Sequence, residues 1–181
     1  MTDKPLFRLV LAALFTALIA VGSYLAIPFV PVPLVLANFF ALLAGLLLGP
    51  LWGGIAVLLY LVLGAMGLPV FSGGSGGFGH FASPTGGFLL GYLLAAIAAG
   101  LVAHGPKRTR QAPGLLRLAL AGLLGLTVLY AIGLPWFQLV LAAKFSTLWA
   151  AFLFMAPYLV GDIVKVAAAV LLTRSLLPLL K

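Results

Sequence analysis

Long apolar runs follow one another along nearly the whole chain, and they limit what it can fold into. An α-helix needs about 20 apolar residues to cross hydrocarbon about 30 Å thick. Inside lipid the backbone must satisfy its own hydrogen bonds, which a helix does. Hydrophobic residues make up 65% of the 181 residues and charged residues only 7%, far below the share of about 25% in soluble domains. The sequence therefore predicts an all-α integral membrane protein whose single domain covers residues 1–181.

Proline and glycine divide the apolar sequence into separate runs. The predicted membrane-spanning helices are six, at residues 9–27, 34–48, 51–66, 85–104, 115–132 and 161–177. The first run is longer than the apolar core of a signal peptide, so we expect it to be retained.

Prolines also shape the segments between these runs. We expect residues 28–33, PFVPVP, to form a stiff extended connector. Gly49 and Pro50 should form a tight turn between the second and third helices. The apolar segment 133–160 is interrupted by Pro135 and Pro157, and we expect short helices there, at the outer face of the membrane.

Basic residues are concentrated in a few places, and they predict the orientation of the chain. Lys107, Arg108, Arg110 and Arg117 form the strongest basic cluster, and Lys4 stands near the N-terminus. By the positive-inside rule, this cluster and both termini should be cytoplasmic, and the protein should lie in the cytoplasmic membrane. The net charge of +8 does not indicate nucleic-acid binding, because the cations are not interleaved with aromatic residues and match no binding motif.

The stretch GLPVFSGGSGGFGHFASPTGG, residues 67–87, is the longest interruption of the apolar sequence. Glycine allows the backbone to approach a ligand closely, which makes Gly73 and Gly74 candidate binding residues. We expect Val70, Phe71, Phe78 and Phe81 to fold this loop onto the helices, with His80 lining a site. The sequence thus predicts an external lid at residues 67–84; a plain loop between helices is the alternative.

Asp162 and Lys165 are charged residues within the last apolar run. Three residues apart, they share one face of a helix, and ionisable residues inside a membrane usually mark functional sites. Pro157 and Gly161 suggest that Asp162 stands near a helix N-terminus, where the helix dipole favours an anion. We interpret the pair as a polar anchor beneath the lid; a purely structural ion pair is the alternative.

The sequence argues against several kinds of chemistry. It contains no cysteine, and Asp3 and Asp162 are its only acidic residues, so paired carboxylates and Ser/His/Asp triads are excluded. His80 and His104 lie far apart, and we expect neither a metal nor a cofactor. The phosphate-binding motif GxxxxGK[ST] is absent, so the chain does not hydrolyse ATP. We therefore expect no enzyme.

Small residues recur on the first helix at Ala13, Ala17 and Ala20. This spacing places them on one face and permits close approach of another helix. That helix could belong to this chain or to a partner subunit.

Three motifs together resemble those of a known family. They are GLPVFSGG at residues 67–74, PTGGFLLGY at 84–92 and VGDIVK at 160–165. The sequence resembles the BioY family, the biotin-binding S components of energy-coupling factor (ECF) transporters of prokaryotes. The resemblance implies an S-component-like bundle that binds biotin with high affinity for uptake. It also implies a transmembrane coupling subunit (EcfT/BioN-like) and a pair of ABC ATPases as partners.

The resemblance also implies roles for individual residues. Asp162 and Lys165 match the GDxxK motif of the family, thought to reach the head of biotin, and Ala13 and Ala17 match its docking motif AxxxA. Where the family usually has GPTGG, this chain has Ser83 before PTGG.

Biotin offers two ureido N–H donors, a ureido carbonyl and a valerate carboxylate. Asp162 would accept an N–H, and Lys165 would donate to the carbonyl or, in another pose, to the carboxylate. Phe71, Phe88 and Tyr158 would cover the thiophane ring and acyl chain. An S component or a solitary facilitator for another small vitamin is the alternative function.

Overall fold

The computed structural model describes residues 5–27, 34–105 and 113–179. Five helices in it are long and apolar enough to cross a membrane. They are α1 (Pro5–Tyr24), α2 (Ala37–Ala65), α3 (Gly86–His104), α4 (Leu115–Val140) and α5 (Leu148–Leu176). The proline-rich connector at 28–33, Asp3, Lys4 and most of the basic cluster at 107–110 lie outside the described residues.

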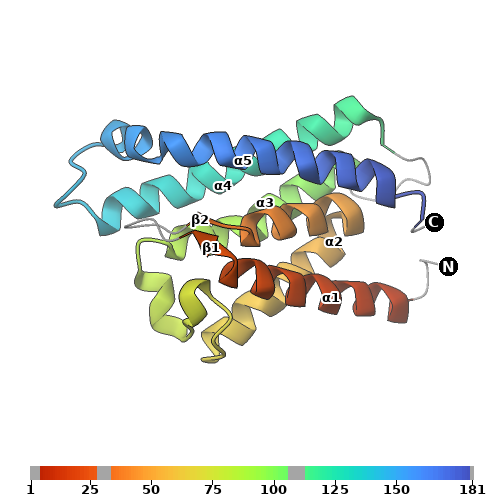
Figure 1. The fold of residues 1–181 in the computed structure, drawn as a ribbon, viewed down its shortest axis with the longest axis horizontal. Helices are drawn as coiled ribbons and strands as arrows, with labels where there is room; N and C mark the ends of the chain where they lie inside the picture. Colours follow the sequence, from red (N-terminus) through yellow and green to blue (C-terminus); the bar gives the residue numbers. More distant parts are fainter. Residues whose placement is uncertain (1–4, 28–33, 106–112, 180–181) are drawn as a thin grey trace.

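The helices lie side by side, with their ends grouped at two ends of the bundle (Figure 1). The start of α1, the end of α3, the start of α4 and the end of α5 lie at one end. The loop between α2 and α3 and the loop between α4 and α5 lie at the other. Two short strands, β1 (Ala26–Ile27) and β2 (Leu34–Val35), pair antiparallel between α1 and α2.

The helix α2 is interrupted at Gly49, whose φ of 84° lies in the left-handed region that favours glycine. A Cβ atom added to Gly53 would lie 2.6 Å from the Cα atom of Gly45, although eight residues of continuous helix would separate the two by about 12 Å. The two halves of α2 therefore fold back on each other, and Figure 1 shows them running in different directions.

Helices α4 and α5 are longer than the sequence predicts. The helix expected at 115–132 continues through Pro135 to Val140, and the one expected at 161–177 begins at Leu148 and runs through Pro157. Thr147 caps the start of α5, because its side-chain oxygen accepts a hydrogen bond from the Ala150 N–H. The prediction of short helices at 133–160 is therefore wrong. Each proline removes one backbone hydrogen bond, but the neighbouring helices pack against α4 and α5 and keep them continuous.

Helix α3 lies between α2 and α4 at the centre of the bundle (Figure 1). Its alanines Ala96, Ala99 and Ala103 are completely buried, as expected where small residues let helices approach closely. The outer helices α1, α4 and α5 expose many leucines and valines, which suits a surface that faces lipid rather than water.

The loop between α2 and α3 folds down onto the bundle through Phe71. This side chain is completely buried and packs edge-on against the rings of Tyr60 and Phe81, with centroid distances of 5.4 and 5.8 Å. Val70 and Phe81 are half-buried, as expected. Phe78 is 79% exposed, so the prediction that it folds inward is wrong.

Two 3₁₀ helices, η1 (Ser72–Gly74) and η2 (Phe78–Ala82), give this loop, hereafter the lid, a defined shape. The hydroxyl of Tyr24 in α1 donates a hydrogen bond to the carbonyl of Pro69. The indole N–H of Trp136 in α4 donates to the carbonyl of Ser83 at 3.1 Å. The lid is thereby held at both of its ends.

Candidate functional site

A cavity lies beneath the lid, among α1, α2, α3, α4 and α5. It has a volume of about 60 Å³ and is partly open to solvent, which is smaller than the roughly 300 to 1,000 Å³ typical of small-ligand sites. Its lining includes the apolar or aromatic side chains Leu34, Val35, Tyr60, Phe88, Leu89, Tyr92, Leu129, Tyr130, Met155 and Tyr158, and the polar side chains Ser23, Asn38, Ser72, His80, Thr85, Asp162 and Lys165.

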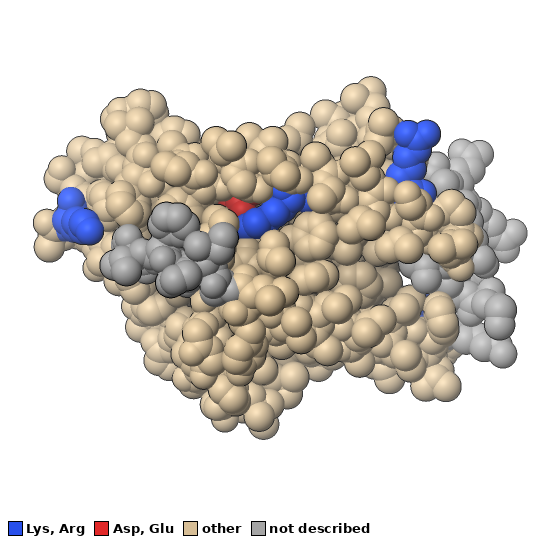
Figure 2. Space-filling model, viewed as in Figure 1, with Lys and Arg blue, Asp and Glu red and all other residues tan. Residues whose placement is uncertain are grey.

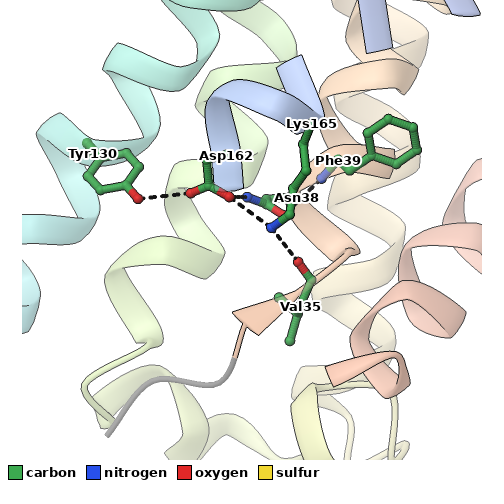
Figure 3. Close-up of polar contacts among 6 residues, drawn as sticks. All are labelled: Val35, Asn38, Phe39, Tyr130, Asp162 and Lys165. Carbon is green, nitrogen blue, oxygen red and sulfur yellow. Dashed lines mark hydrogen bonds and ion pairs between the residues drawn. The ribbon is translucent and has the colours of Figure 1, made fainter. Parts of the chain in front are cut away.

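Asp162 and Lys165 meet in a polar network on one wall of this cavity (Figure 3). The Lys165 Nζ lies 2.8 Å from the Asp162 Oδ1. Asn38 donates from its Nδ2 to the same carboxylate oxygen at 2.7 Å, and the Tyr130 hydroxyl donates to Oδ2 at 2.9 Å. Helices α2, α4 and α5 therefore converge on the Asp162 carboxylate.

Lys165 uses all three of its ammonium protons within the protein. Besides Asp162, its Nζ donates to the Val35 carbonyl at 2.8 Å and to the Asn38 Oδ1 at 3.1 Å. The side chains of Lys165 and Asp162 are only 12% and 9% exposed. A buried charge is costly unless it is paired and hydrogen-bonded, and both conditions are met here.

The position of Asp162 within its helix differs from the prediction. Because α5 begins at Leu148 and continues through Pro157, Asp162 lies in the interior of the helix rather than at its N-terminus. The helix dipole therefore contributes little to stabilising this carboxylate, since its effect is confined to the terminal turn. The three side-chain donors supply the stabilisation instead.

The charged pair is visible from outside the bundle. In Figure 2 acidic and basic atoms lie next to each other at the bottom of a hollow in the face shown. The acidic atoms belong to Asp162, the one acidic residue in the described part of the chain. The site is therefore enclosed on most sides but not sealed.

Three of the other predicted ligand-contacting residues line the cavity, namely His80, Phe88 and Tyr158. His80 belongs to the lid, where its ring lies 5.1 Å from that of Phe71 and its Nε2 lies 3.4 Å from the Thr85 hydroxyl oxygen. Burial lowers the pKa of His80 below its usual 6.5, so the imidazole is neutral at pH 7.

The structure does not bring Phe71, Gly73 or Gly74 to the cavity wall. Phe71 packs behind the wall, against Tyr60 and His80, and anchors the lid. Gly73 is exposed, and a Cβ atom on Gly74 would face the ring of Tyr24 at 3.5 Å. These residues shape the lid rather than line the cavity.

Sequence reasoning missed Asn38, Tyr92 and Tyr130 as site residues. Asn38 is the one strongly polar side chain in its apolar run, and that isolation was a usable signal. Tyr92 and Tyr130 carried no comparable signal, because a tyrosine in an apolar helix usually packs in the core or at the membrane interface.

The alanines of the first helix lie on its outer side. Ala13 and Ala17 are exposed and Ala20 is half-buried, whereas Ala12, Phe15 and Ile19 face the core. No group of three or more metal-ligating side chains occurs among the residues that the structure describes.

The chain is similar to known transporters over nearly its full length. The sequence profile of the BioY family matches residues 1–181. A protein of Pyrococcus horikoshii named "Probable biotin transporter BioY" is 42% identical over 167 residues, which cover 92% of this chain and 93% of that protein. The "Biotin transporter BioY" of Rhodobacter capsulatus is 42% identical over 175 residues, covering 92% of this chain and 90% of that one.

A solved structure shares the fold described above. It is a crystal structure of "the S-component for biotin from an ECF-type ABC transporter", with a TM-score of 0.85 and 28% sequence identity. The match covers 97% of this chain and 93% of that one. Taken together with the family profile and the curated relatives, this match shows that the chain, a multi-pass membrane protein, belongs to the BioY family.

Proposed function

We propose that this chain binds biotin with high affinity and takes it up as the S component of an ECF-type ABC transporter. The observation that carries the proposal is the network around Asp162 and Lys165 in the wall of a cavity beneath the lid. The names of the relatives and of the matching structure point to the same vitamin and do not favour another one. The chain is then a substrate-binding subunit, not an enzyme.

The donors and acceptors of this network suit a ureido ring. The Asp162 carboxylate accepts three hydrogen bonds within the protein and has capacity for a fourth, from a ureido N–H. The Tyr130 oxygen donates its proton to Asp162 and can accept the second N–H. Phe88, Met155 and Tyr158 would then contact the thiophane ring and acyl chain, as apolar walls do in most small-ligand sites.

The proposed topology has six membrane crossings, with both termini in the cytoplasm of a prokaryotic cell. Gly49 divides α2 into halves of about 18 and 24 Å at 1.5 Å per residue. Each half is shorter than hydrocarbon about 30 Å thick, so the surrounding helices must cover its ends. Six crossings return both ends of the chain to the same side, and the positive-inside rule assigns that side to the cytoplasm.

Single-cysteine labelling tests this topology, since the chain has no native cysteine. Ser146→Cys, in the exposed loop between α4 and α5, should react with a membrane-impermeant maleimide in intact cells. Gly114→Cys, at the start of α4, should react only after permeabilisation. The reverse pattern, or labelling of both in intact cells, would contradict the proposal.

Uptake of radiolabelled biotin tests the function. Biotin-auxotrophic bacteria without a biotin transporter should accumulate the label when they express this chain together with an ECF coupling subunit and its two ATPases. Labelled riboflavin and thiamine serve as controls for vitamin specificity and should not accumulate. Absence of biotin uptake despite correct membrane insertion would refute the proposal, and equal uptake without the partners would indicate a solitary facilitator.

A further inference from the structure

Tyr92 in α3 is a buried tyrosine with an unused hydroxyl. Its side chain lines the cavity and is only 8% exposed, yet its hydroxyl forms no hydrogen bond with any residue that the structure describes. By contrast, the hydroxyl of Tyr60 pairs with Ser23 at 2.8 Å and that of Tyr130 with Asp162. A tyrosine hydroxyl that borders a cavity and has no partner among the described residues is available to donate to, or accept from, a ligand.

The surroundings of Tyr92 place it beside the charged network. It also lines a smaller cavity that is bordered by Asn38, Asp162 and Lys165. Asp162 and Lys165 border both cavities together with Tyr92. Tyr92 therefore faces the part of the cavity where the ureido ring is proposed to bind.

The carbonyl oxygen of a ureido ring needs a donor in this place. Lys165 is the obvious candidate, but its three ammonium protons are already donated to Val35, Asn38 and Asp162. The Tyr130 proton is donated to Asp162. The Tyr92 hydroxyl is a donor in this part of the cavity that can bind a ligand without breaking any bond within the protein.

We propose that Tyr92 is a ligand-contacting residue whose hydroxyl donates a hydrogen bond to the ureido carbonyl oxygen. Lys165 then acts as a positioning residue that keeps the Asp162 carboxylate oriented toward a ureido N–H. This inference rests on the proposed biotin binding and adds to it the identity of the carbonyl donor.

The test compares two ligands on two proteins. Biotin and 2-thiobiotin, in which sulfur replaces the ureido oxygen, are titrated into purified wild-type protein and into Tyr92→Phe, which keeps the ring and removes the hydroxyl. The variant should bind biotin about tenfold more weakly, the usual scale of one hydrogen bond. Its affinity for 2-thiobiotin should stay within about twofold of the wild type, because a thiocarbonyl is a poor acceptor.

The outcomes separate the inference from the function on which it rests. Equal weakening of both ligands would mean that Tyr92 only shapes the cavity, and an unchanged affinity for biotin would place the donor elsewhere. Either result overturns the assignment. If a well-folded wild type bound neither ligand, the proposed function itself would fail.

Discussion

The ion pair of Asp162 and Lys165 is embedded in neutral hydrogen-bonding groups rather than in water. Removing one member of such a network leaves the others buried and unsatisfied, which costs more than the net value of the lost bond. Asn38 bridges the two charges, since its amide nitrogen donates to Asp162 and its carbonyl oxygen accepts from Lys165. The same side-chain oxygen, Oδ1 of Asn38, also accepts a hydrogen bond from the Phe39 backbone N–H at 3.0 Å.

Replacement of Asn38 by leucine tests the importance of this bridge. We expect Asn38→Leu to weaken biotin binding by about 1 to 3 kcal/mol, because both charged groups lose a partner in a largely buried site. Calorimetric titration of the purified variant measures the effect. Gln138→Leu is the matched control, since it removes a hydrogen bond to the Phe145 carbonyl at the far end of α4 and should leave affinity unchanged. Equal affinity in Asn38→Leu and wild type would show that the bridge is dispensable.

At the scale of elements, Phe71 anchors the middle of the lid to the bundle, between the hydrogen bonds that hold its two ends. The ring of Phe71 sits directly on Gly64 of α2, where an added Cβ atom would lie 2.2 to 2.8 Å from three ring atoms. Because Gly64 has no side chain, the Phe71 ring can pack directly against the backbone of α2. His80, on the same loop, carries a cavity-lining ring that moves if the anchor moves.

Gly64→Ala should therefore displace Phe71 and loosen the lid. We expect faster proteolysis within residues 67–85 and a biotin dissociation rate raised about tenfold, because opening exposes the ligand site. Gly79→Ala provides the control, since a Cβ atom there meets nothing within 4 Å. Limited proteolysis and stopped-flow dissociation measure the two effects, and a variant with an unaltered lid would disprove the anchoring role of Phe71.

Helix boundaries show where sequence reasoning failed at this scale. The apolar run at 85–104 predicted α3 to within one residue, because glycine-rich and basic segments border it on both sides. Pro135 and Pro157 predict helix ends, although both lie inside continuous helices. In a membrane protein, neighbouring helices can stabilise a helix that lacks one hydrogen bond, and a single sequence does not show where those neighbours will be.

At the scale of the whole molecule, α1 presents the proposed docking face to its surroundings. Ala13 and Ala17 are exposed on a helix whose opposite side packs into the bundle. A smooth alanine face allows a partner helix to approach to van der Waals contact. The proposed partner is the transmembrane coupling subunit.

Ala13→Trp should therefore separate binding from transport. We expect unchanged biotin affinity in detergent and at least a tenfold loss of ATP-driven uptake, since the indole prevents close helix contact. Leu120→Trp, at an exposed position of α4, controls for a bulky residue that faces lipid. Full uptake by Ala13→Trp would place the docking surface elsewhere.

The site could be predicted only in part from the sequence, for a physical reason. Charged residues in apolar helices are rare, so Asp162 and Lys165 stood out, and the structure places them together in a cavity wall. Tyr92 and Tyr130 are aromatic residues in aromatic-rich helices, and their roles depend on which helices α3 and α4 contact. That information lies in the tertiary packing, not in the local sequence.

The measurement that tests the central claim most directly is calorimetric titration of biotin into purified protein, for the wild type, Asp162→Asn and Lys165→Ala. The wild type should bind tightly, and each variant should lose at least about 2 kcal/mol, because one charged partner is left buried without the other. Tight binding retained by both variants would reduce the pair to a structural role. Absence of binding by a well-folded wild type would contradict biotin as the ligand.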